Sequence, residues 1–112
     1  MYGILLVTQG PDQGRTIQVL PGRTLLIGRS PSGPGGLNDP YVSRLHCKVA
    51  LEQGTARLSD AGGEGGTYVN DLKVTEHELQ AGDLVRIGQT SLLFQWTDGD
   101  EKPTGNWTPL RE

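Results

Sequence analysis

Cysteine is almost absent from this sequence: Cys47 is the only one in 112 residues. A single thiol cannot form an internal disulfide, and with two histidines it offers no zinc-ligand spacing. The sequence therefore excludes a disulfide framework and a structural zinc site. We expect a reducing, cytoplasmic setting, no bound metal and no cofactor.

Basic charge and long apolar runs are also scarce. Lys and Arg total 10 against 13 Asp and Glu, for a formal net charge of -3. This balance argues against nucleic acid or a membrane surface as a partner. The apolar N-terminal segment, residues 1–8, has no basic flank and is too short to span a bilayer, so we expect it to form a first strand.

Glycine is abundant, with 17 residues, whereas hydrophobic residues make up only 34%. No segment shows a convincing helical pattern, and short apolar or alternating runs separated by turn residues predict strands. We expect one all-β domain, an antiparallel β-sandwich, over residues 1–97, followed by a polar tail or linker over 98–112. The strands are expected at residues 4–7, 16–20, 25–28, 48–51, 56–59, 67–69, 72–74, 84–87 and 91–96. Glycine-rich loops at 30–36 and 60–66 interrupt them.

Three patterns suggest catalysis or nucleotide binding, and each is incomplete. Ser43, His46 and Asp60 could form a triad, but no nucleophile-elbow motif or oxyanion hole accompanies them. The run GGEGGT at 62–67 lacks the lysine and the following helix of a phosphate-binding P-loop. His77 and Glu78 lack the second histidine of a zinc protease. We therefore expect no catalytic residues and no enzyme activity.

Arg29, Ser43 and Arg44 better fit an anion site. Arg29 directly follows an expected strand, and Ser43 and Arg44 end the loop before the next one. If these loops meet at one end of the sandwich, two guanidinium groups and a hydroxyl could converge on a phosphate. In the alternative, Arg29 pairs with an acid such as Asp39 or Asp60 and only fastens loops together.

Four motifs, in order and at matching intervals, resemble the forkhead-associated (FHA) domain family. They are Gly28-Arg29, then Ser43-x-x-His46, then Gly66-Thr67-x-Val69-Asn70, then Leu79-x-x-Gly82-Asp83-x-x-x-x-Gly88. The resemblance covers about residues 4–96. It implies a β-sandwich of about eleven strands that reads phosphothreonine in partner proteins, acts in kinase-linked signalling or assembly, and is not an enzyme.

The same resemblance implies roles for individual residues. Arg29 would hold the phosphate, Ser43 would donate its hydroxyl, and Arg44 would provide a second contact. His46 would support the loop that carries Ser43. Residues that shape turns and pair buried backbone would be Gly28, Gly66, Thr67 and Asn70, with Asp83 and Gly88 closing the last hairpin.

Gly63, Glu64 and Gly65 depart from the family pattern, which commonly has Ser, a polar residue that is often Thr, and Asn at these positions. The family's Asn would contact the ligand backbone at position 65, and a carboxylate at position 64 would repel a phosphate. Restoring Ser-Thr-Asn should then strengthen binding. Two hypotheses follow: a phosphothreonine-binding module with weak or atypical specificity, or a phosphate-independent docking or oligomerisation scaffold of the same fold.

Overall fold

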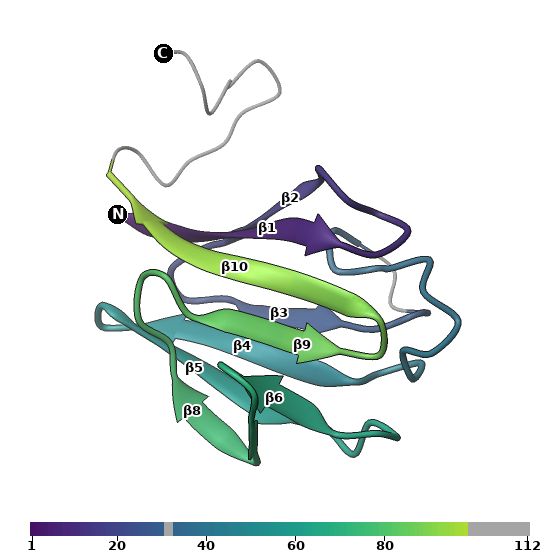
Figure 1. The fold of residues 1–112 in the computed structure, drawn as a ribbon. Coiled ribbons are helices and arrows are strands. Elements are labelled where there is room, and N and C mark those ends of the chain that lie inside the picture. The colour runs from purple at the N-terminus through teal and green to yellow at the C-terminus, as the bar shows by residue number, and fades with distance from the viewer. Residues whose placement is uncertain (31–32, 99–112) are drawn as a thin grey trace.

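The chain forms short strands joined by turns (Figure 1). The computed structural model describes residues 1–30 and 33–98, and this part of the chain contains ten strands and no helix. The strands are β1 (Tyr2–Gln9), β2 (Thr16–Val19), β3 (Thr24–Ile27), β4 (Cys47–Glu52), β5 (Thr55–Asp60), β6 (Thr67–Val69), β7 (Leu72–Val74), β8 (Glu76–Glu78), β9 (Leu84–Ile87) and β10 (Thr90–Thr97). The tail was predicted over residues 98–112, and all of it except Asp98 lies outside the described residues.

Two antiparallel sheets pack face to face around one core. The first has the order β2-β1-β10-β9-β6-β7 and the second has the order β3-β4-β5-β8. Side chains alternate along each strand, so that in β4 Cys47, Val49 and Leu51 are buried while Lys48 and Glu52 are exposed. The inward-facing residues of both sheets form a single hydrophobic cluster. The predicted all-β sandwich is confirmed.

Strand β8 was not predicted from the sequence. Its residues Glu76, His77 and Glu78 show no apolar alternation, but they pair with β5 at the edge of the four-stranded sheet. A short, charged edge strand discourages pairing with other chains. The other nine strands match the expected segments within one or two residues at each end. The described part of the chain thus has ten strands, against about eleven implied by the family resemblance.

The loop between β3 and β4 is held by side chains from the β1–β2 turn. Arg15 donates through Nη1 to the Gly36 carbonyl at 2.6 Å and through Nη2 to the Pro34 carbonyl. Asp12 accepts hydrogen bonds from the backbone and side-chain amides of Asn38 at 2.8 and 2.7 Å. These four bonds fix the direction in which the chain approaches the segment that carries Ser43.

The turn between β6 and β7 is joined to the start of β9 by Asn70. Its side chain donates to Asp83 Oδ1 at 3.0 Å and accepts from the Leu84 N–H at 3.0 Å. Asp83 Oδ2 also accepts from the Gln80 N–H at 2.8 Å and lies 3.1 Å from His77 Nε2. Burial alone would raise the pKa of Asp83, but the hydrogen bonds from Gln80, Asn70 and His77 outweigh it and hold the pKa below its ordinary value.

This network predicts acid sensitivity. Because the folded-state pKa of Asp83 is lowered, its carboxylate stabilises the fold above the unfolded pKa of about 3.9, and this contribution is lost as the pH falls through the folded value. In urea unfolding from pH 7 to pH 2, Asp83→Asn should be less stable than wild type at neutral pH, and the gap should close in acid. Asp71→Asn, at an exposed turn position, is the control. A gap that stays constant with pH would contradict the assignment.

Candidate functional site

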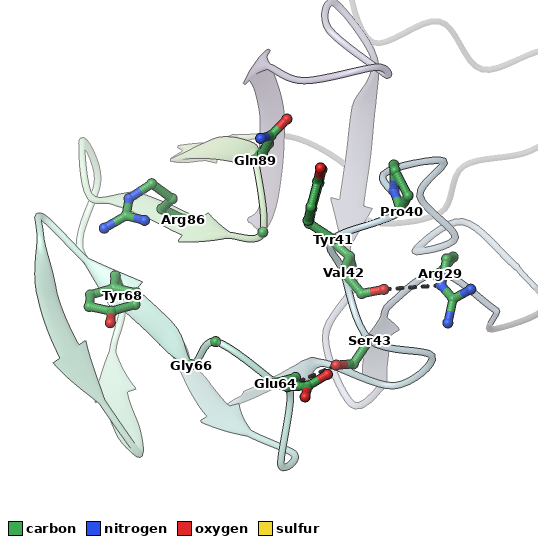
Figure 2. A pocket seen from close by; sticks show the side chains of 12 residues that line it. Arg29, Pro40, Tyr41, Val42, Ser43, Glu64, Gly66, Tyr68, Arg86 and Gln89 are labelled. Carbon is green, nitrogen blue, oxygen red and sulfur yellow. Dashed lines mark hydrogen bonds between the residues drawn. The ribbon is translucent and has the colours of Figure 1, made fainter.

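An open hollow of about 480 Å³ lies at the end of the sandwich where several loops meet (Figure 2). Its walls come from residue 29 after β3, residues 40–43 before β4, residues 64–66 and 68 around the start of β6, and residues 86, 88 and 89 near the β9–β10 turn. We call this hollow the groove. The segments that form it lie far apart in sequence and are brought together by the sheet order.

Arg29 lies on the wall of the groove and is fixed by the neighbouring loop. Its backbone N–H donates to the Ser43 carbonyl at 2.9 Å, and its Nε donates to the Val42 carbonyl at 3.1 Å. Gly28 permits this close approach, because a Cβ there would lie 2.1 Å from the Arg44 carbonyl oxygen. With Nε engaged, the exposed terminal nitrogens of the guanidinium remain available to a ligand.

The two acids considered as partners for Arg29 are engaged elsewhere. Asp39 is 0% exposed and accepts from the Tyr41 N–H, the Gln89 N–H and the Thr90 hydroxyl at 2.7–2.8 Å. Asp60 accepts from the Thr67 hydroxyl at 2.7 Å and the Gly62 N–H at 3.2 Å. Within residues 1–30 and 33–98, no ion pair includes Arg29. The alternative in which Arg29 fastens loops through an acid is therefore wrong for these two partners.

His46 is 0% exposed, and both of its ring nitrogens bind backbone. Nδ1 accepts a hydrogen bond from the Ser43 N–H at 3.1 Å, so the proton is on Nε2, which donates to the Gly66 carbonyl at 2.9 Å. The ring thus connects the loop before β4 with the loop before β6. Neither nitrogen bonds the Ser43 hydroxyl or Asp60, so these residues do not form a triad.

Ser43 Oγ accepts a hydrogen bond from the Glu64 N–H at 2.8 Å. A hydroxyl has one proton to donate and two lone pairs, so this bond leaves the proton free for an acceptor in the groove. Figure 2 shows the Ser43 hydroxyl and the Arg29 guanidinium on the same side of the groove. A bound anion could receive donors from both.

Arg44, predicted to be a second ligand contact, does not line the groove. Its side chain is exposed, and its carbonyl accepts from the Ser30 N–H at 3.2 Å. Its backbone therefore shapes the loop, and a ligand contact by its guanidinium stays a prediction.

The loop at 63–66 is shaped by close packing and by backbone conformation. A Cβ on Gly63 would lie 2.3–2.5 Å from atoms of the buried His46 ring, so a larger residue does not fit without displacing the ring. Gly65 and Gly66 have φ angles of +86° and +85°, which favour glycine. Open space surrounds Gly65, whereas the Glu64 carboxylate borders the groove.

Tyr68 and Arg86 also line the groove and were not recognised from the sequence. Each lies between two buried residues of its strand, so the alternation indicates that both point outward. The pairing of β6 with β9, which places them opposite each other, has no signal in the local sequence.

No helix in the described residues is long and apolar enough to cross a membrane. Nor do His, Cys, Asp and Glu side chains of that part of the chain gather in a group of three or more that could hold a metal ion.

Known proteins are similar to this chain over most of its length. A family model described as the cytoplasmic domain of an inner membrane component of the type III secretion system matches residues 6–98. An oxoglutarate dehydrogenase inhibitor from Corynebacterium diphtheriae is 36% identical over 92 residues, which are 82% of this chain and 64% of that protein. The FHA domain-containing protein FhaA of Mycobacterium tuberculosis is 35% identical over 82 residues, 73% of this chain and 15% of that protein. The chain thus spans less than two thirds of these relatives.

Solved structures give the same result. An FHA domain studied for phosphothreonine-dependent interactions has a TM-score of 0.79 and 31% identity, covering 88% of this chain and 99% of that one. The FhaA FHA domain, solved in complex with the intracellular domain of Rv3910, has a TM-score of 0.75 and 31% identity, covering 83% of this chain and 99% of that one.

The contacts of His46 and Ser43 predict different effects of mutation. His46→Ala should lower the free energy of unfolding by about 1–3 kcal/mol, because it leaves the Ser43 N–H and the Gly66 carbonyl without their partner. Ser43→Ala should cost less than about 1 kcal/mol, since the Glu64 N–H it frees is near solvent. Urea unfolding measures both. If the two variants lose the same free energy of unfolding, the supporting role is wrongly assigned to His46.

Proposed function

The chain belongs to the forkhead-associated (FHA) domain family, and we propose that it is a phosphothreonine-dependent protein-interaction module acting in kinase-linked signalling or assembly. Its ligand would be a phosphothreonine-containing segment of a partner protein. The phosphate would lie at the end of the groove formed by Arg29 and Ser43. The proposal places the module in the cytoplasm and assigns it no catalytic step.

The arrangement of Arg29 and Ser43 carries this proposal. A phosphate dianion needs charge-assisted donors, and a guanidinium held by one nitrogen can offer its remaining N–H groups to two phosphate oxygens. The Ser43 hydroxyl is oriented by the Glu64 N–H and can donate to a third. On a chain of net charge -3, an arginine in a groove that forms no ion pair with an acid of residues 1–30 and 33–98 supports the proposal of a local anion site.

The buried histidine argues against a hydrolase. A general base must be able to accept a proton from the nucleophile, but His46 Nδ1 accepts from backbone and Nε2 donates to backbone. The inhibitory activity in the name of the corynebacterial relative belongs to that protein. For this chain we propose binding alone, with the partner identified by its phosphothreonine.

The second candidate is a phosphate-independent scaffold, and the loop at 63–65 favours it. Position 65 offers no side chain to a peptide, and the Glu64 carboxylate borders the groove. At about 6 Å from a phosphate, with an effective dielectric of about 20–80, this carboxylate would cost roughly 0.7–3 kcal/mol per unit of phosphate charge before salt screening. The phosphate-reading candidate is preferred because Arg29 and Ser43 both remain available.

Arg29→Ala tests the phosphate site directly. Losing charge-assisted hydrogen bonds should weaken binding of a library-selected phosphothreonine peptide by about 1.5–3 kcal/mol, roughly a factor of ten to more than a hundred. Calorimetry with the phosphorylated and unphosphorylated peptides measures the loss. Arg57→Ala, on β5 and outside the groove, is the matched control. Arg44→Ala, measured in parallel, shows whether its guanidinium reaches the ligand. Equal affinity of wild type for both peptide forms would favour the scaffold.

We predict that substitutions in the loop at 63–65 will raise phosphopeptide affinity. The substitutions differ from the Ser-Thr-Asn replacement expected from the sequence, because only positions 64 and 65 are changed. Glu64→Gln should strengthen phosphopeptide binding severalfold at low salt, and the gain should shrink as salt is raised. Gly65→Asn adds an amide where space is open. The φ of +86° favours glycine, and Asn is used because it adopts positive φ with less strain than most side chains. Gly63→Ser should instead destabilise the fold, because its Cβ would overlap the His46 ring.

Calorimetry at two salt concentrations and urea unfolding separate these effects. The double variant Glu64→Gln, Gly65→Asn should bind about tenfold more tightly if the two gains add. If it folds normally and binds no phosphothreonine peptide, the scaffold hypothesis replaces the phosphate-reading one. If Gly63→Ser is as stable as wild type, the packing of this loop on His46 is wrongly interpreted.

A further inference from the structure

A second cationic group lies at the opposite end of the groove from Arg29. Figure 2 shows Arg86 and Tyr68 on one side of the groove and Arg29 on the other. The guanidinium carbon of Arg86 lies 4.5 Å from the centre of the Tyr68 ring, within cation–π range. The phosphate contacts proposed above use Arg29 and Ser43 and leave this end of the groove without a role.

Three neighbouring strands bring the residues of this end together. Tyr68 pairs with Lys73 of β7 on one side and with Arg86 of β9 on the other. Because directly paired residues point to the same face of a sheet, Lys73, Tyr68 and Arg86 form an outward-facing row. Lys73 and Arg86 are exposed, and the end of the Lys73 side chain lies beside Gly66, which lines the groove.

The cations of this row have no acidic partner in the described part of the chain. The ion pairs there are Arg15–Asp12, Arg57–Glu76 and His77–Asp83. An arginine stacked on an aromatic ring keeps its N–H groups free, because they point outward in the plane of the guanidinium. Stacking also restricts the side chain before a ligand arrives, so less conformational entropy is lost on binding.

We propose that the Lys73–Tyr68–Arg86 row is a second anion subsite that selects partners with another acidic group near the phosphothreonine. Arg86 would form the main contact, a forked pair of hydrogen bonds to a carboxylate or phosphate. Lys73 would add a point charge beside it. The anion could be an Asp or Glu side chain or a second phosphorylated residue. This inference rests on the proposed function, because it deepens the ligand specificity of the same groove.

A peptide scan tests the subsite without knowledge of the partner. The parent probe is a phosphothreonine peptide flanked by alanines, and each further peptide replaces one flanking alanine by Asp. We expect one or two Asp positions on one side of the phosphothreonine to raise affinity about three- to tenfold over the parent at low salt. Phosphoserine at the same position should raise the affinity further than Asp does. This comparison distinguishes a second phosphorylated residue from an acidic side chain as the preferred anion.

A double-mutant cycle assigns the effect to the row. The ratio of affinities for the best Asp peptide and the parent should fall to about one in Arg86→Gln and by a smaller factor in Lys73→Gln. Tyr68→Leu should lower the ratio as well, since it removes the ring that holds the guanidinium. Arg57→Gln makes the same charge change on β5, outside the groove, and should keep the wild-type ratio.

The outcomes distinguish this inference from the proposed function. If the parent binds and no Asp position raises affinity, or the gain persists in Arg86→Gln, the second subsite is excluded while phosphothreonine binding stands. If Arg57→Gln lowers the ratio of the two peptide affinities as much as Arg86→Gln does, the gain from Asp comes from the net charge of the protein, and the second subsite is excluded. If no phosphothreonine peptide binds at all, both proposals fail together.

Discussion

The geometry of the groove depends on one buried imidazole. His46 is enclosed where water cannot replace its partners, and it binds the Ser43 N–H and the Gly66 carbonyl with opposite hydrogen-bonding roles. An unpaired polar group in such a position is costly, so the two loops are fixed relative to each other. Gly63 packs directly on the ring, which explains why this position has no side chain. The orientation of Ser43 toward the groove follows from this contact.

Asp39 holds the opposite wall in a similar way. Its buried carboxylate binds the Tyr41 N–H on its own loop and the Gln89 N–H and Thr90 hydroxyl on the β9–β10 turn. Two buried polar residues therefore fix the loops of the groove, together with Val42, which anchors the loop before β4 in the hydrophobic core. This is consistent with a chain in which only 34% of residues are hydrophobic. Loops form most of the site, and strands β6 and β9 add Tyr68 and Arg86.

Features with a local pattern could be predicted from the sequence, and features that depend on distant pairing could not. Alternation and turn residues located nine strands, but β8 lacks apolar residues and is defined by its pairing with β5. The choice of Arg29 and Ser43 as candidate phosphate contacts followed from their spacing in the sequence and from a family resemblance. The stacking of Arg86 on Tyr68 depends on the register of β6 and β9. The overlap between a side chain at Gly63 and the His46 ring depends on where that ring lies, 17 residues earlier in the chain.

The charges around the groove indicate how a weak phosphate site could still be selective. Under the proposed function, Glu64 would have two opposing effects: its N–H bonds the Ser43 hydroxyl and would orient it for phosphate, while its carboxylate would repel phosphate. A ligand that depends on Arg29 alone would meet that repulsion without compensation. A ligand with a second anion would gain the proposed contact at Arg86, at the other end of the groove. The repulsion would lower the affinity of every phosphopeptide alike, so it would not change their relative affinities. The proposed contact at Arg86 would be made only by ligands with suitable spacing, and that contact would supply the discrimination. Glu64 would then contribute by keeping phosphopeptides without a second anion weakly bound.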